Sequence, residues 1–171
     1  IARLPQEDFC QALGVAPDQK YEQGGGPGMQ KCLQLLQGSA DREDTNLFLL
    51  TQLAFLLMAA TDGHAKNFSI YLDRGDAYRM TPLYDVLSMW PYFGDGANQF
   101  RPRKAGLAMA VRSKNAHDLL HTIQARHWQQ LAARHGGATV WAAMIELVAG
   151  VDGALARVER RLPKDFPAHT W

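Results

Sequence analysis

The segment TDGHAKN, residues 61–67, places a carboxylate, an imidazole, an ammonium group and a carboxamide close together in the chain. It follows a long apolar run, residues 47–60, and precedes FSIYL, residues 68–72, whose β-branched and aromatic side chains predict a strand. Gly63 lets the backbone turn tightly within this polar segment. We expect the rest of the chain to support this loop, because reactive side chains need a rigid element to hold them in place.

The composition is that of one ordinary globular domain. The chain has 171 residues, 47% of them hydrophobic and 20% charged. The 18 basic and 17 acidic side chains nearly cancel, so net charge gives no reason to expect nucleic acid or an anionic membrane as the main partner. The apolar run is shorter than the roughly 20 residues of a membrane helix, so no membrane association is expected. Cys10 and Cys32 fit no disulfide framework, which favours buried thiols and a cytoplasmic location.

The remaining pattern predicts a mainly α fold with a small β-hairpin. Helical spacing and stop signals predict helices over residues 5–14, 29–36, 44–60, 116–123, 127–135 and 139–162. Asp44 or Thr45 is expected to cap the central helix. Residues 68–72 and 77–80 are predicted to pair about a turn, and a further strand is predicted over residues 107–111.

The predicted hairpin determines where Asp85 lies. Because Tyr84 and Asp85 directly follow the second strand, antiparallel pairing returns them toward the Asp62 loop. Asp62, Asn67 and Asp85 then form a set suited to phosphoryl transfer, with Asp62 as the base and the other two as oxygen ligands for Mg²⁺. His64 lies between them and is a candidate for contact with phosphate, as is Lys66. The structural alternative is that Asp62 only caps a turn and Asp85 only caps the next helix.

Other kinds of site fit less well. His117 and His121 are four residues apart, as zinc ligands on a helix are, but the glutamate of HExxH and a third ligand are missing. No GxSxG motif marks a hydrolase, and nothing singles out two aspartates as a glycosidase pair. The glycine-rich residues 24–28 follow no predicted strand and precede no GK[ST], which favours a turn. The basic residues Arg101, Arg103 and Lys104 are either solvated surface or contacts to a phosphate backbone.

The pattern Asp62-x-His64-x-x-Asn67, followed by Tyr84-Asp85, resembles the catalytic loop and metal-binding aspartate of the HipA-like toxin serine/threonine kinases. Similar pieces also occur over residues 3–8, 20–28, 61–69, 78–85 and 162–167, so the resemblance covers nearly the whole chain. It implies one domain, residues 1–171, that is the helical C-terminal lobe of a protein-kinase-like fold. The glycine-rich loop and strand lysine that grip ATP are not visible, so a nucleotide lobe is expected upstream.

The same resemblance implies an activity and partners. Asp62 would be the proton acceptor, Asn67 and Asp85 would hold Mg²⁺, and ATP would be contacted by His64, Ala65, Lys66, Asn67, Tyr84 and Asp85. The implied function is that of a type II toxin that phosphorylates serine or threonine of a protein, with an aminoacyl-tRNA synthetase as the target class. A HipB-type antitoxin is the implied partner, and operator DNA would be bound through the antitoxin complex.

Two alternatives remain open. Small-molecule and lipid phosphotransferases share the Asp-x-His-x-x-Asn spacing, so the acceptor need not be a protein. The chain could also be a catalytically incomplete module that binds antitoxin and DNA. The eukaryotic kinase family is disfavoured, because Ala60-Thr61 and Val86-Leu87 stand where that family has His-Arg and Phe-Gly.

Overall fold

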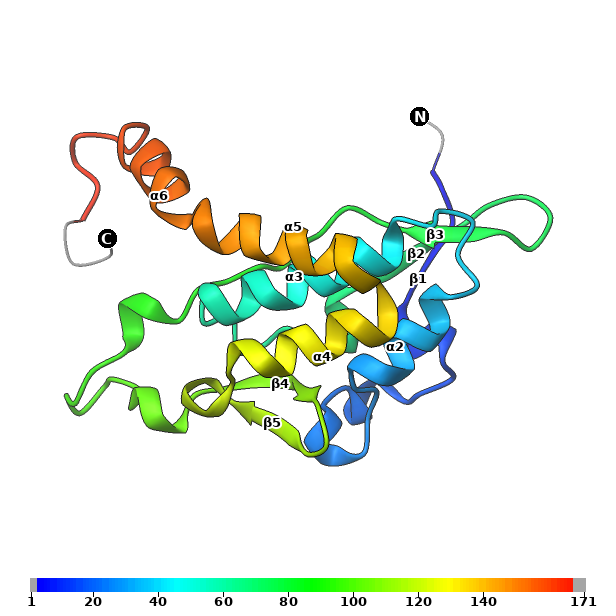
Figure 1. Cartoon of the computed structure of the whole chain (residues 1–171), viewed down its shortest axis with the longest axis horizontal. Coiled ribbons are helices and arrows are strands. Elements are labelled where there is room, and N and C mark those ends of the chain that lie inside the picture. The colour runs from blue at the N-terminus through cyan, green and yellow to red at the C-terminus, as the bar shows by residue number, and fades with distance from the viewer. Residues whose placement is uncertain (1–2, 168–171) are drawn as a thin grey trace.

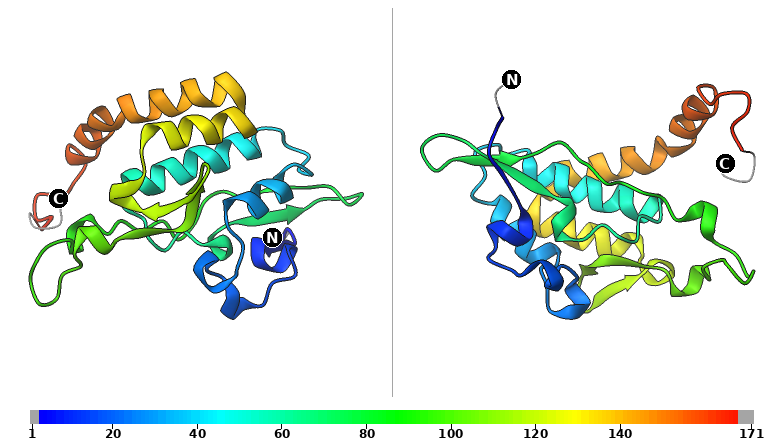
Figure 2. Two further views of the ribbon diagram at one scale, coloured as in Figure 1. Left: turned by 60° about the horizontal axis from the view of Figure 1, so that its bottom comes forward. Right: turned by 180° about the vertical axis from the view of Figure 1, so that it is seen from behind.

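The computed structural model describes residues 3–167 and has a mixed α/β architecture (Figure 1). Helices α3 (Asp44–Leu57), α4 (Ala125–His135) and α5 (Gly137–Ala149) lie side by side and contact one another. A three-stranded antiparallel sheet and a two-stranded ribbon flank these helices, as the further views show (Figure 2). The predicted helical character is therefore present, but the fold contains strands beyond the expected hairpin and the further strand expected over residues 107–111.

The first sheet has the order β1-β2-β3, formed by β1 (Gln6–Asp8), β2 (Ser69–Leu72) and β3 (Tyr78–Met80). Ile70 lies opposite Met80 across β2 and β3, which confirms the predicted hairpin. The third strand, β1, pairs with the other edge of β2 and was not expected. The hairpin is therefore held on both sides of β2, next to the polar loop.

The predicted helix over residues 5–14 is wrong in its first half. The chain stays extended through Asp8, and helix α1 spans only Phe9–Ala12. Asp8 is the N-cap: its carboxylate accepts the backbone N–H of Gln11 at 2.9 Å, and the Gln11 side chain accepts the N–H of Asp8. The acidic residues that suggested a first helical turn thus belong to the strand and the cap.

Helix α3 leads directly to the polar loop but ends at Leu57, three residues before the predicted end. Ala59 adopts a left-handed backbone with φ of 49°, and the N–H of Ala60 donates to the carbonyl oxygen of Phe55 at 2.8 Å. This pattern closes a helix C-terminus, usually with glycine at the left-handed position. Because alanine occupies it here, the end of the helix carries no sequence signal.

The start of α3 is fastened to the first sheet by Asp44, which does not cap the helix as predicted. The N-cap position is Glu43, whose side chain makes no capping hydrogen bond. Asp44 is 5% exposed, and its carboxylate accepts the backbone N–H of Met80 at 2.6 Å and the hydroxyl of Ser39 at 2.5 Å. A buried carboxylate needs hydrogen-bond donors. Because one of these donors is the backbone of Met80, Asp44 fixes the start of α3 against strand β3.

Four phenylalanines form the part of the core that lies under the polar loop. The ring of Phe68 is 4.9 Å from Phe48, 5.6 Å from Phe9 and 5.8 Å from Phe55, measured between centroids. All four are at most 2% exposed. The cluster joins α1, α3 and the residue that precedes β2. Cys10 and Cys32 are also buried free thiols, as expected.

The second sheet is a ribbon of β4 (Gly106–Arg112) and β5 (Ala116–Leu119), which confirms the strand predicted over residues 107–111. The helix predicted over residues 116–123 is wrong, because Ala116 pairs with Arg112 across a tight turn and a 3₁₀ turn follows β5. His117 and His121 therefore do not share a helix face. Within residues 3–167 no cluster of three or more His, Cys, Asp or Glu side chains could hold a metal ion.

The C-terminal helices differ from the single helix predicted over residues 139–162. The chain breaks at Gly150 into α5 and α6 (Val151–Glu159), while α2 (Met29–Leu36) matches its predicted range. Over residues 3–167 no individual helix has both the length and the apolar character to cross a membrane. The bent pair α5 and α6, at 43°, passes that test on length and composition only.

The stacked rings of His117 and His127 predict a stability that depends on pH. Their centroids are 3.8 Å apart, and burial, then His117 and Arg126, lowers the pKa of His127 below 6.5. The folded state therefore favours neutral His127, so its contribution is complete above about pH 6.5 and is lost as pH falls through the lowered pKa. Burial lowers the pKa values of His64 and His135 too, so these groups change the free energy of unfolding with pH in the same direction.

We expect the free energy of unfolding to fall between about pH 8 and about pH 5, and to fall less in the variant His127→Gln. Urea unfolding at the two pH values measures the difference. His121→Gln, at an exposed position, is the matched control and should keep the wild-type dependence. An unchanged pH dependence in His127→Gln would contradict the assignment.

Candidate functional site

The polar loop packs directly on the end of α3. An added Cβ on Gly63 would lie 2.3 Å from the ring of Phe55, so glycine is required there for close approach, whereas the sequence suggested a tight turn. Ala65 is fully buried, and residues Ala65–Asn67 form a 3₁₀ turn that leads into β2. The loop is therefore fixed at both ends by the core.

Asn67 and Asp85 are brought together, as predicted. The Nδ2 of Asn67 donates to Oδ2 of Asp85 at 2.8 Å, and the Oδ1 of Asn67 accepts the backbone N–H of His64 at 3.2 Å. Asn67 is 3% exposed. Asp85 is exposed and adopts a left-handed backbone with φ of 56°, which is uncommon outside glycine and typical of turns and functional sites.

Asp62 keeps an accessible carboxylate. Its side chain is 58% exposed, its Oδ1 accepts the hydroxyl of Tyr21 at 2.6 Å, and Oδ1 lies 3.8 Å from Nε2 of His64. Burial, then the nearby Lys20, lowers the pKa of His64, so its ring is neutral near pH 7. Asp62 thus has no cationic imidazole beside it.

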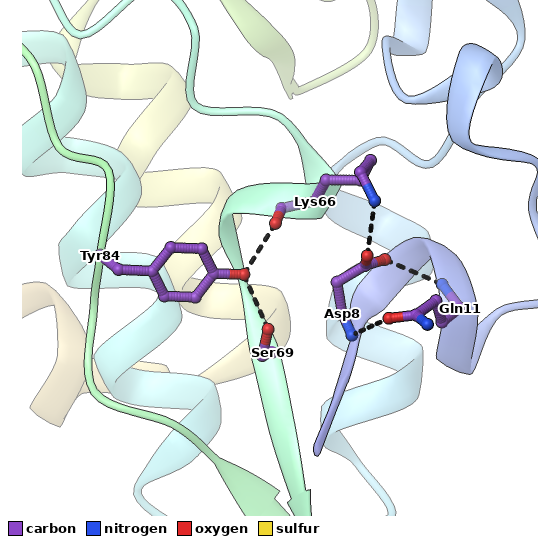
Figure 3. Close-up of polar contacts among 5 residues, drawn as sticks. All are labelled: Asp8, Gln11, Lys66, Ser69 and Tyr84. Carbon is purple, nitrogen blue, oxygen red and sulfur yellow. Dashed lines mark hydrogen bonds and ion pairs between the residues drawn. The ribbon is translucent and has the colours of Figure 1, made fainter.

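Lys66 and Tyr84 stabilise the loop from the side of the first sheet (Figure 3). The ammonium of Lys66 contacts the carboxylate of Asp8 at 2.6 Å, and this hydrogen bond raises the pKa of Lys66. The hydroxyl of Tyr84 lies 2.7 Å from the carbonyl oxygen of Lys66 and 2.7 Å from the hydroxyl of Ser69. Lys66 and Tyr84, which were both expected to contact ATP, therefore make hydrogen bonds within the protein.

A cavity of about 640 Å³ opens beside Asp62. Its walls come from the polar loop, strands β4 and β5, the segment 89–105, and Tyr21 and Gln23. Arg101 and Lys104 line it, and neither forms an ion pair with any of the described acidic side chains. Asn67 and Asp85 do not line the cavity, so Asp62 is the member of the predicted set that borders it.

The glycine-rich residues 24–28 have a structural explanation. An added Cβ on Gly26 would lie 2.0 Å from the carbonyl oxygen of Gln19, and one on Gly28 would lie 2.3 Å from the carboxyl carbon of Glu22. The segment is a turn closed against its own preceding residues. The close packing at Gly26 and Gly28 supports the turn that the sequence favoured over a phosphate-binding loop.

Sequence reasoning missed Tyr21 and Asp8. Each contacts a predicted site residue from more than forty positions away: Tyr21 contacts Asp62, and Asp8 contacts Lys66. Neither belongs to a motif with a chemical meaning of its own. The available signal for Tyr21 was its place between Lys20 and Glu22, immediately before the glycine-rich turn.

Asn67 and Asp85 offer a carboxamide and a carboxylate, which carry the kind of oxygen ligand that magnesium takes, but Asn67 turns its Nδ2 and not its Oδ1 toward Asp85. Asn67 Oδ1 accepts one hydrogen bond and has a second lone pair, while Oδ1 of Asp85 accepts none from the described residues. Magnesium in phosphoryl-transfer sites takes one or two protein oxygens and completes its shell with phosphate and water. In the described part of the chain, residues 3–167, no cluster of three or more acidic, His or Cys side chains could hold the ion, so a pair of this kind would need phosphate and water to complete the shell.

One protein family and two bacterial proteins are similar to this chain. The family described as HipA-like C-terminal domain matches residues 2–159. The Sinorhizobium fredii protein named "Putative kinase Y4mE" is 45% identical over 95 residues, which is 54% of this chain and 22% of that protein. A second protein of that organism, "Putative kinase Y4dM", is 37% identical over 87 residues, which is 50% of this chain and 20% of that protein.

A solved structure shares the fold. It is described as a complex of Shewanella oneidensis MR-1 toxin–antitoxin system HipA, HipB and its operator DNA, with 22% identity and a TM-score of 0.75. The match covers 98% of this chain and 40% of the solved chain. This chain thus spans well under two thirds of the proteins that it resembles.

Proposed function

This chain belongs to the family of HipA-like C-terminal domains, and from that membership we propose that it is the catalytic lobe of a kinase. The proposed reaction is Mg²⁺- and ATP-dependent phosphoryl transfer to a serine or threonine of a protein. The observation that carries the proposal is the arrangement of one loop: it presents the exposed carboxylate of Asp62 to a cavity and hydrogen-bonds Asn67 to Asp85.

Asp62 is the proposed general base. Its carboxylate accepts the proton of the acceptor hydroxyl while that oxygen bonds to phosphorus and the bond to the leaving phosphate breaks. Neutral His64 beside it adds no positive charge that would compete for the carboxylate. The buried attachment of the loop keeps the base in one place, which is the main requirement when catalysis rests on positioning.

Asn67 and Asp85 are the proposed magnesium ligands. Magnesium, when bound, offsets the negative charge of the phosphates. The two hydrogen bonds that Asn67 makes fix its carboxamide, with Oδ1 toward the backbone N–H of His64 and Nδ2 toward Asp85. The left-handed backbone of Asp85 directs its carboxylate back to the loop, where Asn67 holds one of its oxygens.

The proposed contacts to ATP are made by His64, Ala65, Lys66, Asn67, Tyr84 and Asp85. Tyr84 and Asp85 are exposed and the Lys66 side chain is 32% exposed, whereas His64 and Ala65 are buried. The nucleotide would therefore meet the edge of the loop that Lys66, Tyr84 and Asp85 form. His64 and Ala65 would act mainly by shaping the backbone of that edge.

The remaining parts of the kinase and its partners are proposals supported by the relatives. Because this chain covers 40% of the solved chain, we place the glycine-rich loop and strand lysine that grip ATP elsewhere in the full-length protein. The solved complex contains HipB and operator DNA, which supports a HipB-type antitoxin as partner and operator DNA bound through it. An aminoacyl-tRNA synthetase as acceptor rests on the family resemblance alone.

The variant Asp85→Asn tests the metal assignment. In the full-length protein we expect phosphotransfer to fall by about 100-fold or more, because one electrostatic stabiliser of the transferring phosphate is lost. Transfer of labelled phosphate from ATP to protein, measured against magnesium concentration, gives the result. The matched control is Asp76→Asn, at an exposed hairpin turn with φ of 60°, because asparagine tolerates this backbone equally well.

The same assay separates the alternatives. Label on a small molecule or lipid instead of protein would favour a small-molecule phosphotransferase. Antitoxin binding without any magnesium-dependent ATP binding in calorimetry would favour an interaction module. Full activity of Asp85→Asn at low magnesium concentration would contradict the metal assignment.

A further inference from the structure

Tyr21 makes the shortest contact to the proposed base, and the reaction as described gives it no role. Its hydroxyl donates to Oδ1 of Asp62 at 2.6 Å. Its ring meets the buried ring of His64 edge-on, with centroids 5.0 Å apart and planes at 80°. Tyr21 also lines the cavity that Asp62 borders. Tyr21 therefore contacts both the proposed base, Asp62, and the neighbouring His64.

Tyr21 is held in place by the turn that follows it. Its carbonyl oxygen accepts the N–H of Gly24 at 3.0 Å and that of Gly26 at 2.9 Å. A Cβ on Gly26 would lie 2.8 Å from the same oxygen, so only glycine allows this closure. The glycine-rich turn thus fixes the backbone of Tyr21.

Glu22 and Gln23 attach the segment that holds Tyr21 to the ribbon of β4 and β5. The Glu22 side chain is 14% exposed and accepts the N–H of Ala110 at 2.7 Å and Nε of Arg112 at 3.0 Å. Nε2 of Gln23 donates to the carboxylate of Asp118 on β5 at 2.8 Å. Strands β4 and β5 also form part of the cavity wall. One short segment therefore connects the base, the cavity wall and the ribbon.

We propose that Tyr21 is a positioning residue that fixes Oδ1 of Asp62 and leaves Oδ2 for an acceptor hydroxyl that enters from the cavity. This inference rests on the proposed function of Asp62 as the base. No other described group donates a hydrogen bond to the Asp62 carboxylate, so Oδ2 is free. In the reaction the acceptor proton passes to Oδ2, and Tyr21 keeps its own proton throughout.

Two observations favour positioning over a block of the site. The hydrogen bond to Asp62, and then burial, raises the pKa of Tyr21 above 10, so the phenol stays protonated and can donate at neutral pH. A blocking side chain would have to leave before the acceptor arrives. Departure of Tyr21 would disturb the closed turn and the Glu22 contacts to β4.

The variant Tyr21→Phe in the full-length protein keeps the ring against His64 and removes only the hydroxyl. We expect kcat to fall roughly 10-fold to 100-fold, as for a lost hydrogen bond to a charged group, with the KM for ATP unchanged. Tyr71→Phe is the matched control, because the Tyr71 hydroxyl makes no hydrogen bond to the described residues and its ring contacts Arg79. It should retain wild-type kcat.

The outcomes distinguish this inference from the proposed function. Unchanged kcat in Tyr21→Phe would overturn the positioning role, and raised kcat would show that Tyr21 blocks the site. If Asp62→Asn retains activity, the proposed function itself fails, whatever Tyr21 does.

A titration of the tyrosine ring carbons by NMR tests the contact without any activity. Among the five tyrosines, the resonance that disappears in Tyr21→Phe should titrate above the ordinary tyrosine pKa of about 10. In Asp62→Asn its pKa should move down toward that value, because the carboxylate charge is gone. A Tyr21 titration that Asp62→Asn leaves unchanged would overturn the inference even if the kinetic variants were unstable.

Discussion

The full-length protein carrying Asp62→Asn is expected to lose phosphotransfer by about 1,000-fold, within the range typical of a lost general base. The carboxamide has nearly the shape of the carboxylate, and its oxygen can still accept the hydroxyl of Tyr21, so the loop should keep its structure. It cannot take the proton of the acceptor. Transfer of labelled phosphate from ATP to protein, under single-turnover conditions, measures the loss in the chemical step.

The control for this experiment is Asp152→Asn, an exposed aspartate in the first turn of α6, far from the loop in sequence. It should leave phosphotransfer unchanged. Calorimetry should show that Asp62→Asn still binds Mg²⁺ and ATP, because the ligands assigned to the metal are Asn67 and Asp85. Retained transfer in Asp62→Asn would remove Asp62 from the role of base.

The sequence predicted the arrangement of the loop and the hairpin, because its cues are close together in the chain. The loop residues lie within seven consecutive positions, 61–67. The hairpin that brings Asp85 back to this loop has strong strand and turn signals. The hydrogen bond from Asn67 to Asp85 follows directly from this geometry. The hairpin matches the expectation, whereas the helix signals over residues 5–8 and the cap expected at Asp44 or Thr45, which are also short-range patterns, do not.

Two of the features that the sequence did not reveal, strand β1 and the contact of Tyr21, rest on long-range contacts, whereas β5 pairs with the neighbouring β4. Strand β1 has only three residues, and its pairing partner, β2, lies more than sixty positions away. Strand β5 has four residues, AHDL, which read equally well as a helical turn. Tyr21 reaches Asp62 across 41 positions. For β1 and Tyr21 the partner is distant in the chain, and a single sequence carries no record of it.

The glycines show the same limit. Gly63 and Gly26 were expected as turn residues, yet each is needed because a neighbour lies too close for a Cβ: the Phe55 ring for Gly63, and the carbonyl oxygen of Gln19 for Gly26. Ala59 shows the converse, since a left-handed residue without glycine leaves a helix end unmarked. The presence of glycine indicates where the chain can turn, but the close neighbours that exclude a Cβ at Gly63 and Gly26 are visible only in the packed structure.

The variant Phe68→Ala is expected to cost about 3–5 kcal/mol of the free energy of unfolding, as for a fully buried aromatic ring. Phe68 is 1% exposed, contacts the rings of Phe9, Phe48 and Phe55, and directly follows Asn67. A domain of this size has roughly 5–15 kcal/mol in total, so the variant would be close to unfolding. Urea unfolding followed by circular dichroism measures the change.

The matched control is Phe100→Ala, whose ring is 62% exposed and whose loss should change stability by no more than about 0.5 kcal/mol. Phe68→Leu should lie between the two, because it keeps most of the apolar volume. A loss below about 1 kcal/mol in Phe68→Ala would mean that the aromatic cluster does not anchor the loop. With the predicted loss, the same variant in the full-length protein should lose phosphotransfer on mild warming, well below the temperature at which Asp62→Asn unfolds. That difference would separate the support of the loop from its chemistry.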